Sequence, residues 1–198
     1  MNNDLHNIIS KKRWESLVEE FSPRLLVHAL SFEESMSLAY DLFFENYSDS
    51  PKIRDFSLNL FFAIRKHYTA EWDKDWKNDI LLSGLCHLGY KYDEYFYCCM
   101  RAYKKFEDPP PAVLIALAGC YYAFRPRVTL DEAESLLQRA IQKEVSYEAA
   151  LQLRGIYRAK QDQAKVDYWT KIIEETERKN IRTDPCTPDL FKDKKNNC

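Results

Sequence analysis

The chain has 198 residues, of which 45% are apolar, 30% are charged and 14% are aromatic. This apolar fraction excludes intrinsic disorder, and 29 basic against 31 acidic side chains leave no cationic excess to neutralise nucleic-acid phosphates. We therefore expect no nucleic-acid partner. The four glycines are too few for a typical β-rich fold or a glycine-loop nucleotide site.

In chain order, the sequence predicts one helix after another. Serine followed at once by proline, at Ser22 and Ser50, places a capping hydroxyl before a first-turn proline. Ser31 and Glu34 have the spacing of a capping box, and Gly89 after an apolar helix is expected to adopt the left-handed conformation. The expected helices span residues 4–20, 23–30, 32–47, 51–69, 74–88, 93–107, 111–124, 130–143, 146–160 and 163–179.

The connections between these ten helices are short, so neighbouring helices are expected to pack antiparallel. The sequence thus predicts an all-α fold of helical hairpins stacked as an α-α superhelix. We expect one domain over residues 1–180, made of amino-terminal helices (1–70) and a repeat region (78–175). Residues 181–198 hold two prolines and many polar side chains, and we expect a flexible tail there.

No targeting or membrane segment is expected. The first residues lack the apolar segment of a secretory signal, and the longest apolar run, 112–124, is too short to span a bilayer. We therefore expect a cytoplasmic protein with no membrane partner. The six cysteines form no C-x-x-C pair, so reduced thiols are expected, with no metal site and no cofactor.

Three helix pairs in the second half of the chain are similar to one another. Gly84, Gly119 and Gly155 recur within the first helix of each pair at intervals of 35 and 36 residues. A period near 34 residues with two helices per unit is the signature of tetratricopeptide repeats. The ten residues from Asp131 to Ala140 resemble the second helix of such a repeat. The resemblance extends over residues 78–175.

The resemblance implies a concave surface lined by the first helix of each pair. Members of this family that clamp a carboxylate have Lys, Arg and Asn there, whereas this chain has mainly apolar residues. An apolar groove for a peptide of a partner protein is therefore expected, with Lys91, Arg125 and Arg127 as rim charges. The expected peptide-binding residues are Leu81, Leu85, Leu88, Val113, Leu117, Cys120, Leu153 and Ile156. The sequence makes no prediction of the oligomeric state.

Other interpretations stay open. The same leucines are equally compatible with a plain core, which applies if other parts of the chain cover the concave face. Short stretches, such as Ala116 to Cys120, are similar to class II chaperones of type III secretion, and toxin-neutralising immunity proteins form another small helical class. A helical enzyme with an unrecognised site is the last alternative. No nucleotide or nucleophile motif supports an enzyme, and Cys86 and His87 are sequential neighbours that point about 100° apart on a helix.

Overall fold

The protein is described here by a computed structural model, which covers residues 2–46, 50–123 and 125–178. The expected tail at 181–198 lies outside these residues, as do Cys186 and Cys198. The described part of the chain contains α-helices, one short 3-10 helix and no strand, which confirms the all-α prediction. It divides into two compact units, with the boundary between Asn78 and Asp79. Each unit is described by itself.

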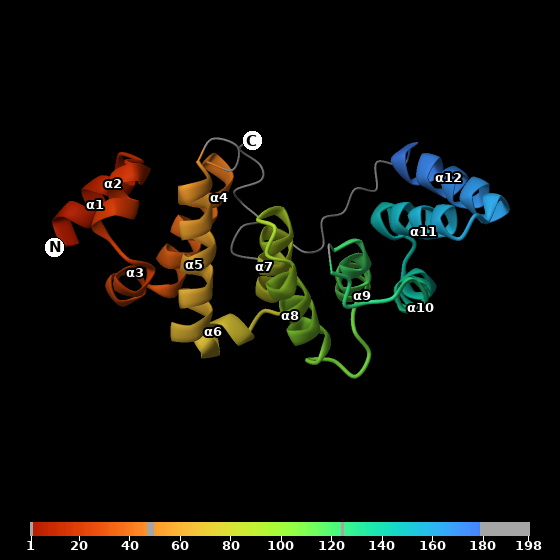
Figure 1. The fold of residues 1–198 in the computed structure, drawn as a ribbon. Helices are drawn as coiled ribbons and strands as arrows, with labels where there is room; N and C mark the ends of the chain where they lie inside the picture. Colours follow the sequence, from red (N-terminus) through yellow and green to blue (C-terminus); the bar gives the residue numbers. More distant parts are fainter. Residues whose placement is uncertain (1, 47–49, 124, 179–198) are drawn as a thin grey trace. The chain divides into compact units, whose positions relative to one another are not determined.

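Unit 1 is built around α5, which contacts α2, α3, α4 and α6 (Figure 1). The largest buried side chains of this unit include Phe43, Phe61 and Trp72, which supply the apolar area that stabilises it. Buried Ser57 on α5 donates a hydrogen bond of 2.7 Å to the carbonyl of Ala39 on α4. The helices are α1 (Asn2–Ser10), α2 (Trp14–Glu20), α3 (Pro23–Ala29), α4 (Phe32–Glu45), α5 (Pro51–His67) and α6 (Thr69–Asp73).

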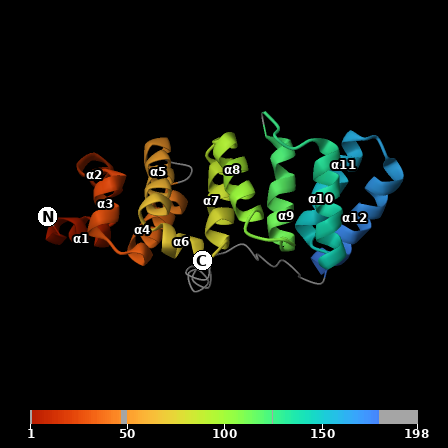
Figure 2. The same cartoon turned by 90° about the horizontal axis from the view of Figure 1, so that it is seen from below.

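Unit 2 is a succession of helices in which each contacts its neighbours in sequence. The α9 helix contacts α8 on one side and α10 on the other, and α11 contacts α10 and α12. Both views of the ribbon show α8, α9 and α10 side by side (Figure 2). The helices are α7 (Lys77–Leu88), α8 (Tyr92–Tyr103), α9 (Pro111–Ala118), the 3-10 helix η1 (Gly119–Tyr122), α10 (Leu130–Lys143), α11 (Tyr147–Ala159) and α12 (Gln163–Arg178).

The predicted caps are present. Ser22 and Ser50 accept hydrogen bonds from the third residue after each of them, and Ser31 forms the predicted capping box with Glu34. Thr129 and Glu132 form a second capping box at the start of α10. Caps are predictable because they depend on residues three positions apart in the sequence.

Three expected helices are not continuous α-helices over their predicted ranges. The helix expected at 4–20 breaks around Lys12, whose φ is 50°, and after the break buried Trp14 donates a hydrogen bond to Glu45 on α4. The helix expected at 51–69 ends at His67, and the separate α6 follows it. The helix expected at 111–124 is α-helical only to Ala118 and then tightens into η1.

The turn after α7 differs from the one predicted. No described glycine has a positive φ, and the left-handed residue after α7 is Tyr90, with φ of 60°, rather than Gly89. The N–H of Lys91 donates to the carbonyl of Cys86, and that of Tyr90 to the carbonyl of His87, which together form a Schellman motif. The end of α11 forms the same motif around Gln161, with φ of 59°. The interval from Tyr90 to Gln161 equals the interval from Gly84 to Gly155. The first and the third helical hairpin of unit 2 therefore have the same type of turn.

The repeated glycines have different surroundings. A Cβ added to Gly119 would lie 2.6 Å from the hydroxyl of Tyr95 on α8, and one added to Gly155 would lie 2.2 Å from that of Tyr122 in η1. Both glycines therefore permit a tyrosine from an earlier element to approach the helix backbone closely. A Cβ on Gly84 would meet nothing within 4 Å.

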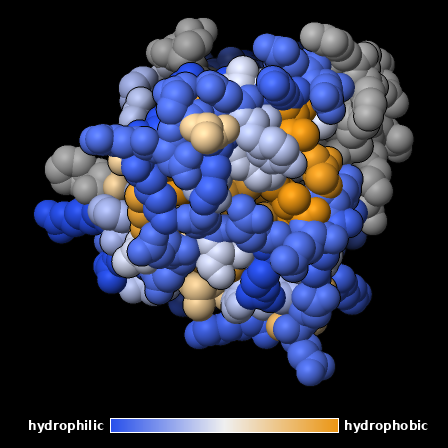
Figure 3. Space-filling model, turned by 90° about the vertical axis from the view of Figure 1, so that its right-hand side faces the viewer, coloured by the Kyte–Doolittle hydropathy of each residue, from blue (hydrophilic) through white to orange (hydrophobic). Residues whose placement is uncertain are grey.

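The last helix presents a hydrophilic outer face. Figure 3 shows the molecule from the side of α12, where hydrophilic residues predominate and hydrophobic ones form limited patches. On α12, Lys165, Asp167, Lys171 and Glu174 are exposed, whereas Trp169 and Ile173 are buried. Within the described residues, α12 therefore packs against α11 and leaves a charged face exposed.

Candidate functional site

The eight sequence-predicted binding residues lie in unit 2 on α7, α9, η1 and α11. Leu81 is half-buried and Leu88 is 39% exposed. The side chains of the other six are buried, with exposed fractions of 5% or less, namely Leu85, Val113, Leu117, Cys120, Leu153 and Ile156.

The burial of these six residues has a physical cause. Helix α9 lies between α8 and α10 and is apolar all round, so Val113 packs inside the unit. Likewise, α11 lies between α10 and α12 and buries Leu153 and Ile156. These six side chains are therefore buried in the hydrophobic core, which is one of the two interpretations that the sequence leaves open. Among them, Leu117 also reaches a surface cavity.

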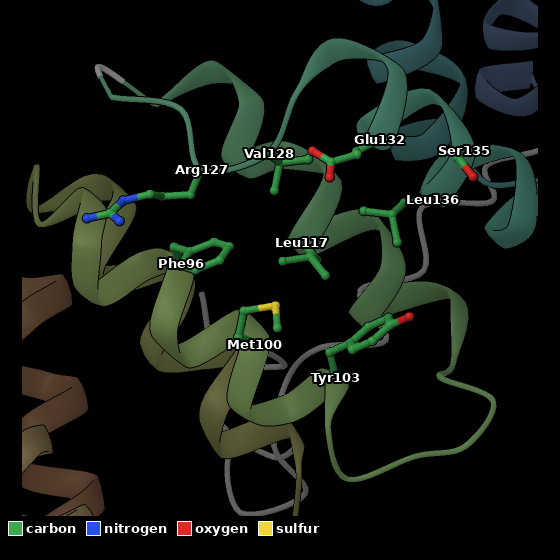
Figure 4. Close-up of a pocket in the computed structure, with 9 residues that line it drawn as sticks. All are labelled: Phe96, Met100, Tyr103, Leu117, Arg127, Val128, Glu132, Ser135 and Leu136. Atoms are coloured by element: carbon green, nitrogen blue, oxygen red, sulfur yellow. The ribbon is translucent and has the colours of Figure 1, made fainter.

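This cavity is a groove of about 370 Å³ between α8 and α10. Buried Leu117 and Val128 form its floor, and half-buried side chains of α8 and α10 form its walls. Figure 4 shows the apolar lining side chains around this space, with those of α8 on one side, that of Leu136 on the other and that of Leu117 between them. The α8/α10 groove is lined by Phe96, Met100, Tyr103, Leu117, Arg127, Val128, Glu132, Ser135 and Leu136.

The wall formed by α8 is an apolar stripe. Phe96, Met100 and Tyr103 follow the i, i+4, i+7 pattern that places three side chains along one side of a helix. A second stripe, which includes Tyr95 and Ala102, begins one position earlier and is buried inside the unit. Because consecutive residues are about 100° apart on a helix, the first stripe lies beside the buried face and is only partly covered.

The wall formed by α10 combines apolar and polar side chains. Leu136 is half-buried in the groove, whereas Ala133 and Leu137 are buried on the face that α10 turns to the unit's interior. Glu132 lies at the amino-terminal end of this wall, where its carboxylate accepts hydrogen bonds of 2.8 Å from the backbone N–H and the hydroxyl of Thr129. These hydrogen bonds lower the pKa of Glu132, so it is charged at neutral pH.

Arg127 lines one end of the groove, and Arg139 contacts the lining residue Tyr103 at the other end. At one end, Arg127 donates to the carboxylate of Asp93 on α8 at 2.8 Å, and this pairing raises the pKa of Arg127. At the other end, Arg139 on α10 donates to the hydroxyl of Tyr103 at 3.2 Å. The first contact connects the loop before α10 to the start of α8. The second connects α10 itself to the end of α8.

The predicted rim charges divide between two places. Arg127 lines the α8/α10 groove. Lys91 and Arg125 line a separate cavity of about 210 Å³, together with Tyr90, Tyr92, Asp93 and Glu94.

Phe96, Met100 and Leu136 are not among the binding residues predicted from the sequence. A signal for the α8 stripe was present, because Phe96, Met100 and Tyr103 have helical spacing. Whether such a stripe is covered depends on the loop before α10, and helical spacing alone carries no information about that loop.

Metal-binding side chains do not gather in the described part of the chain. There, no cluster of three or more His, Cys, Asp or Glu side chains is placed to hold a metal ion. Cys86 is buried and His87 is exposed, which agrees with their expected separation on α7. No helix within the described ranges has the length and apolar character that crossing a bilayer demands.

Comparisons of the chain with family models, with curated proteins and with solved structures found no match.

Proposed function

We propose that this protein is a non-catalytic helical-repeat module that binds a peptide segment of a partner protein in the α8/α10 groove. The observation that carries the proposal is the groove itself, an apolar cavity with a buried floor and half-exposed walls. Its volume of about 370 Å³ lies in the range of sites that take one or two large side chains or a small ligand. Apolar contact supplies the affinity, as in other helical grooves that take peptide side chains.

The repeat character of unit 2 supports this proposal. The resemblance of residues 78–175 to tetratricopeptide repeats implies a protein-binding surface. The matching turns at Tyr90 and Gln161 follow the same period as the glycines. The groove we propose lies between two second helices, α8 and α10, rather than on the first-helix face expected from the resemblance.

Peptide selection from a random 12-residue display library on the immobilised full chain tests the proposal. We expect enrichment of peptides with one or two large apolar residues. Met100→Glu and Leu136→Glu should each weaken the binding of these peptides at least about tenfold. A carboxylate in the groove either loses its water when the peptide binds, which costs free energy, or keeps its water and prevents the peptide from binding. Phe96→Ala, a milder change, should weaken binding as well.

The matched control is Tyr168→Glu, which places the same charge on an exposed aromatic position of α12, 55% exposed and outside the groove. It should leave peptide binding unchanged. Circular dichroism must show the same helix content for all variants. If no peptide is enriched, or if enriched peptides bind Met100→Glu and Tyr168→Glu alike, the groove is not the binding site.

A further inference from the structure

The two ends of the α8/α10 groove carry opposite charge. Glu132 and Arg139 are seven residues apart on α10, which places them about 10 Å apart along the helix axis. Glu132 lines the amino-terminal end of the α10 wall, and Arg139 bonds to Tyr103 at the carboxy-terminal end of the α8 wall. The apolar floor and walls lie between them.

The neighbouring ion pairs do not cancel the difference in charge between the two ends of the groove. The guanidinium of Arg127 is balanced by Asp93, so this pair adds no net charge near Glu132. Beyond Arg139, Lys143 is balanced by Asp108 at 2.5 Å. No carboxylate in the described part of the chain forms an ion pair with Arg139, which donates to the neutral hydroxyl of Tyr103.

The hydrogen bond with Tyr103 also orients Arg139. The guanidinium has five N–H donors in a planar arrangement, and the contact with Tyr103 uses one of them. The remaining donors can bind both oxygens of a carboxylate, which is the geometry that arginine provides and lysine does not. At the opposite end, the carboxylate of Glu132 repels a second carboxylate.

We propose, building on the function proposed above, that the guest of the groove is a peptide with an apolar anchor and an acidic side chain on one side only. The anchor occupies the space over Leu117, and the acidic side chain binds Arg139 at the Tyr103 end. Glu132 disfavours the reversed orientation. Arg139 therefore determines the direction in which the peptide binds.

Three synthetic peptides with the same leucine-rich anchor test this inference. One carries three aspartates before the anchor, one carries them after it, and the third carries three glutamines before and after it. Affinities for the full chain are measured by fluorescence anisotropy at low and high salt. We expect the neutral peptide to bind, one acidic peptide to bind about fivefold more tightly and the other to bind no better than the neutral one.

Arg139→Glu should remove the advantage of the favoured acidic peptide over the neutral peptide. Substituting lysines for the aspartates of the favoured peptide should restore its advantage over the neutral peptide in this variant, as expected for a direct charge contact. The advantage of the favoured peptide should also decrease at high salt, because salt screens exposed charges.

The outcomes separate the two proposals. If the neutral peptide binds but the two acidic peptides have equal affinity, or if Arg139→Glu has no effect on their ratio, the orientation by Arg139 is refuted and the groove stands. If none of the peptides binds wild-type protein while display selection yields no binder, the groove itself is refuted. Arg139→Gln serves as a second variant, because it keeps a donor for Tyr103 and removes only the charge.

Discussion

The carboxylate of Asp79, which is fully buried in the first turns of α7, lies 3.2 Å from Nε of Arg101 in the last turn of α8. The ammonium of Lys105 lies 3.0 Å from the other oxygen of the same carboxylate. The antiparallel pairing of α7 and α8 is therefore fixed at this end by two cations around one buried anion. Both cations are partly exposed, whereas the anion is not.

Asp79→Asn should destabilise unit 2 by about 2–3 kcal/mol, because it replaces the buried carboxylate with a neutral amide and leaves Arg101 and Lys105 without their anion. The measurement is urea unfolding followed by circular dichroism. Asp93→Asn is the matched control, since it breaks the exposed pair with Arg127. That change should have a much smaller effect on stability. Equal effects of both variants would contradict the structural importance assigned to Asp79.

Gln161→Gly should stabilise the protein by about 0.5–1 kcal/mol, because glycine adopts a positive φ without the steric cost of a Cβ. Tyr90→Gly should act in the same direction at the equivalent turn. Thermal unfolding measures both. Gln161→Ala is the control and should bring no gain, since alanine keeps the Cβ. A loss of stability on introducing glycine would show that these turns are not left-handed.

Substitution of the three repeated glycines by alanine should give effects of different sign. Gly84→Ala should stabilise the protein by up to about 1 kcal/mol, because the position is helical and nothing lies within 4 Å of the new Cβ. Gly119→Ala should destabilise it by about 1–3 kcal/mol, because buried Tyr95 cannot move away easily. The hydroxyl of Tyr95 is held by a hydrogen bond of 2.8 Å to the carbonyl of Ala116.

The clash at Gly119 can be tested with a second change. Tyr95→Phe removes the oxygen that lies 2.6 Å from the added Cβ, so the double variant should lose less stability than the sum of the two single variants. Gly155→Ala should be milder than Gly119→Ala, because the hydroxyl it would meet belongs to Tyr122, which is 52% exposed and can move. If the effects of Tyr95→Phe and Gly119→Ala on stability were strictly additive, the Tyr95 hydroxyl would not lie close to the backbone of Gly119.

Glu134 on α10 should make stability depend on pH in the acid range. Hydrogen bonds from Lys160 and from the Tyr157 hydroxyl lower the pKa of Glu134 below its usual 4.5, and they connect α10 to α11. Because the folded-state pKa is the lower one, this stabilisation is present above about pH 4.5 and is lost as the pH falls through the folded-state value. Glu134→Gln should therefore be less stable than wild type at pH 7, and the difference should disappear at low pH. A difference that is independent of pH would contradict this assignment.

The features predicted correctly from the sequence depend on short-range rules. The caps at Ser22, Ser31 and Ser50 follow from residues a few positions apart, and helical spacing alone indicates the all-α class. The break at Lys12 was not predictable in this way, because the contact that accompanies it joins Trp14 and Glu45, which are distant in sequence.

The candidate site was only partly predictable for the same reason. Leu117 is a predicted binding residue that is buried and lines the α8/α10 groove, whereas Val113 and Ile156 satisfy the same apolar pattern and are buried in the core. An apolar residue on a helix can face a neighbouring helix or a groove, and helical spacing is identical in both cases. Which one applies depends on the path of the loop that carries Arg127 and Val128, which closes one end of the α8/α10 groove.

The methionine methyl groups offer the most direct test of the proposed groove. Met100 lines the groove, whereas Met36 is fully buried in unit 1 and serves as an internal control. Full-length protein labelled with ¹³C at the methionine methyls is titrated with the neutral leucine-anchored peptide. We predict that the Met100 signal shifts and saturates while the Met36 signal stays in place. A Met100 signal that does not move at saturating peptide, or one that moves together with Met36, would contradict binding in the α8/α10 groove.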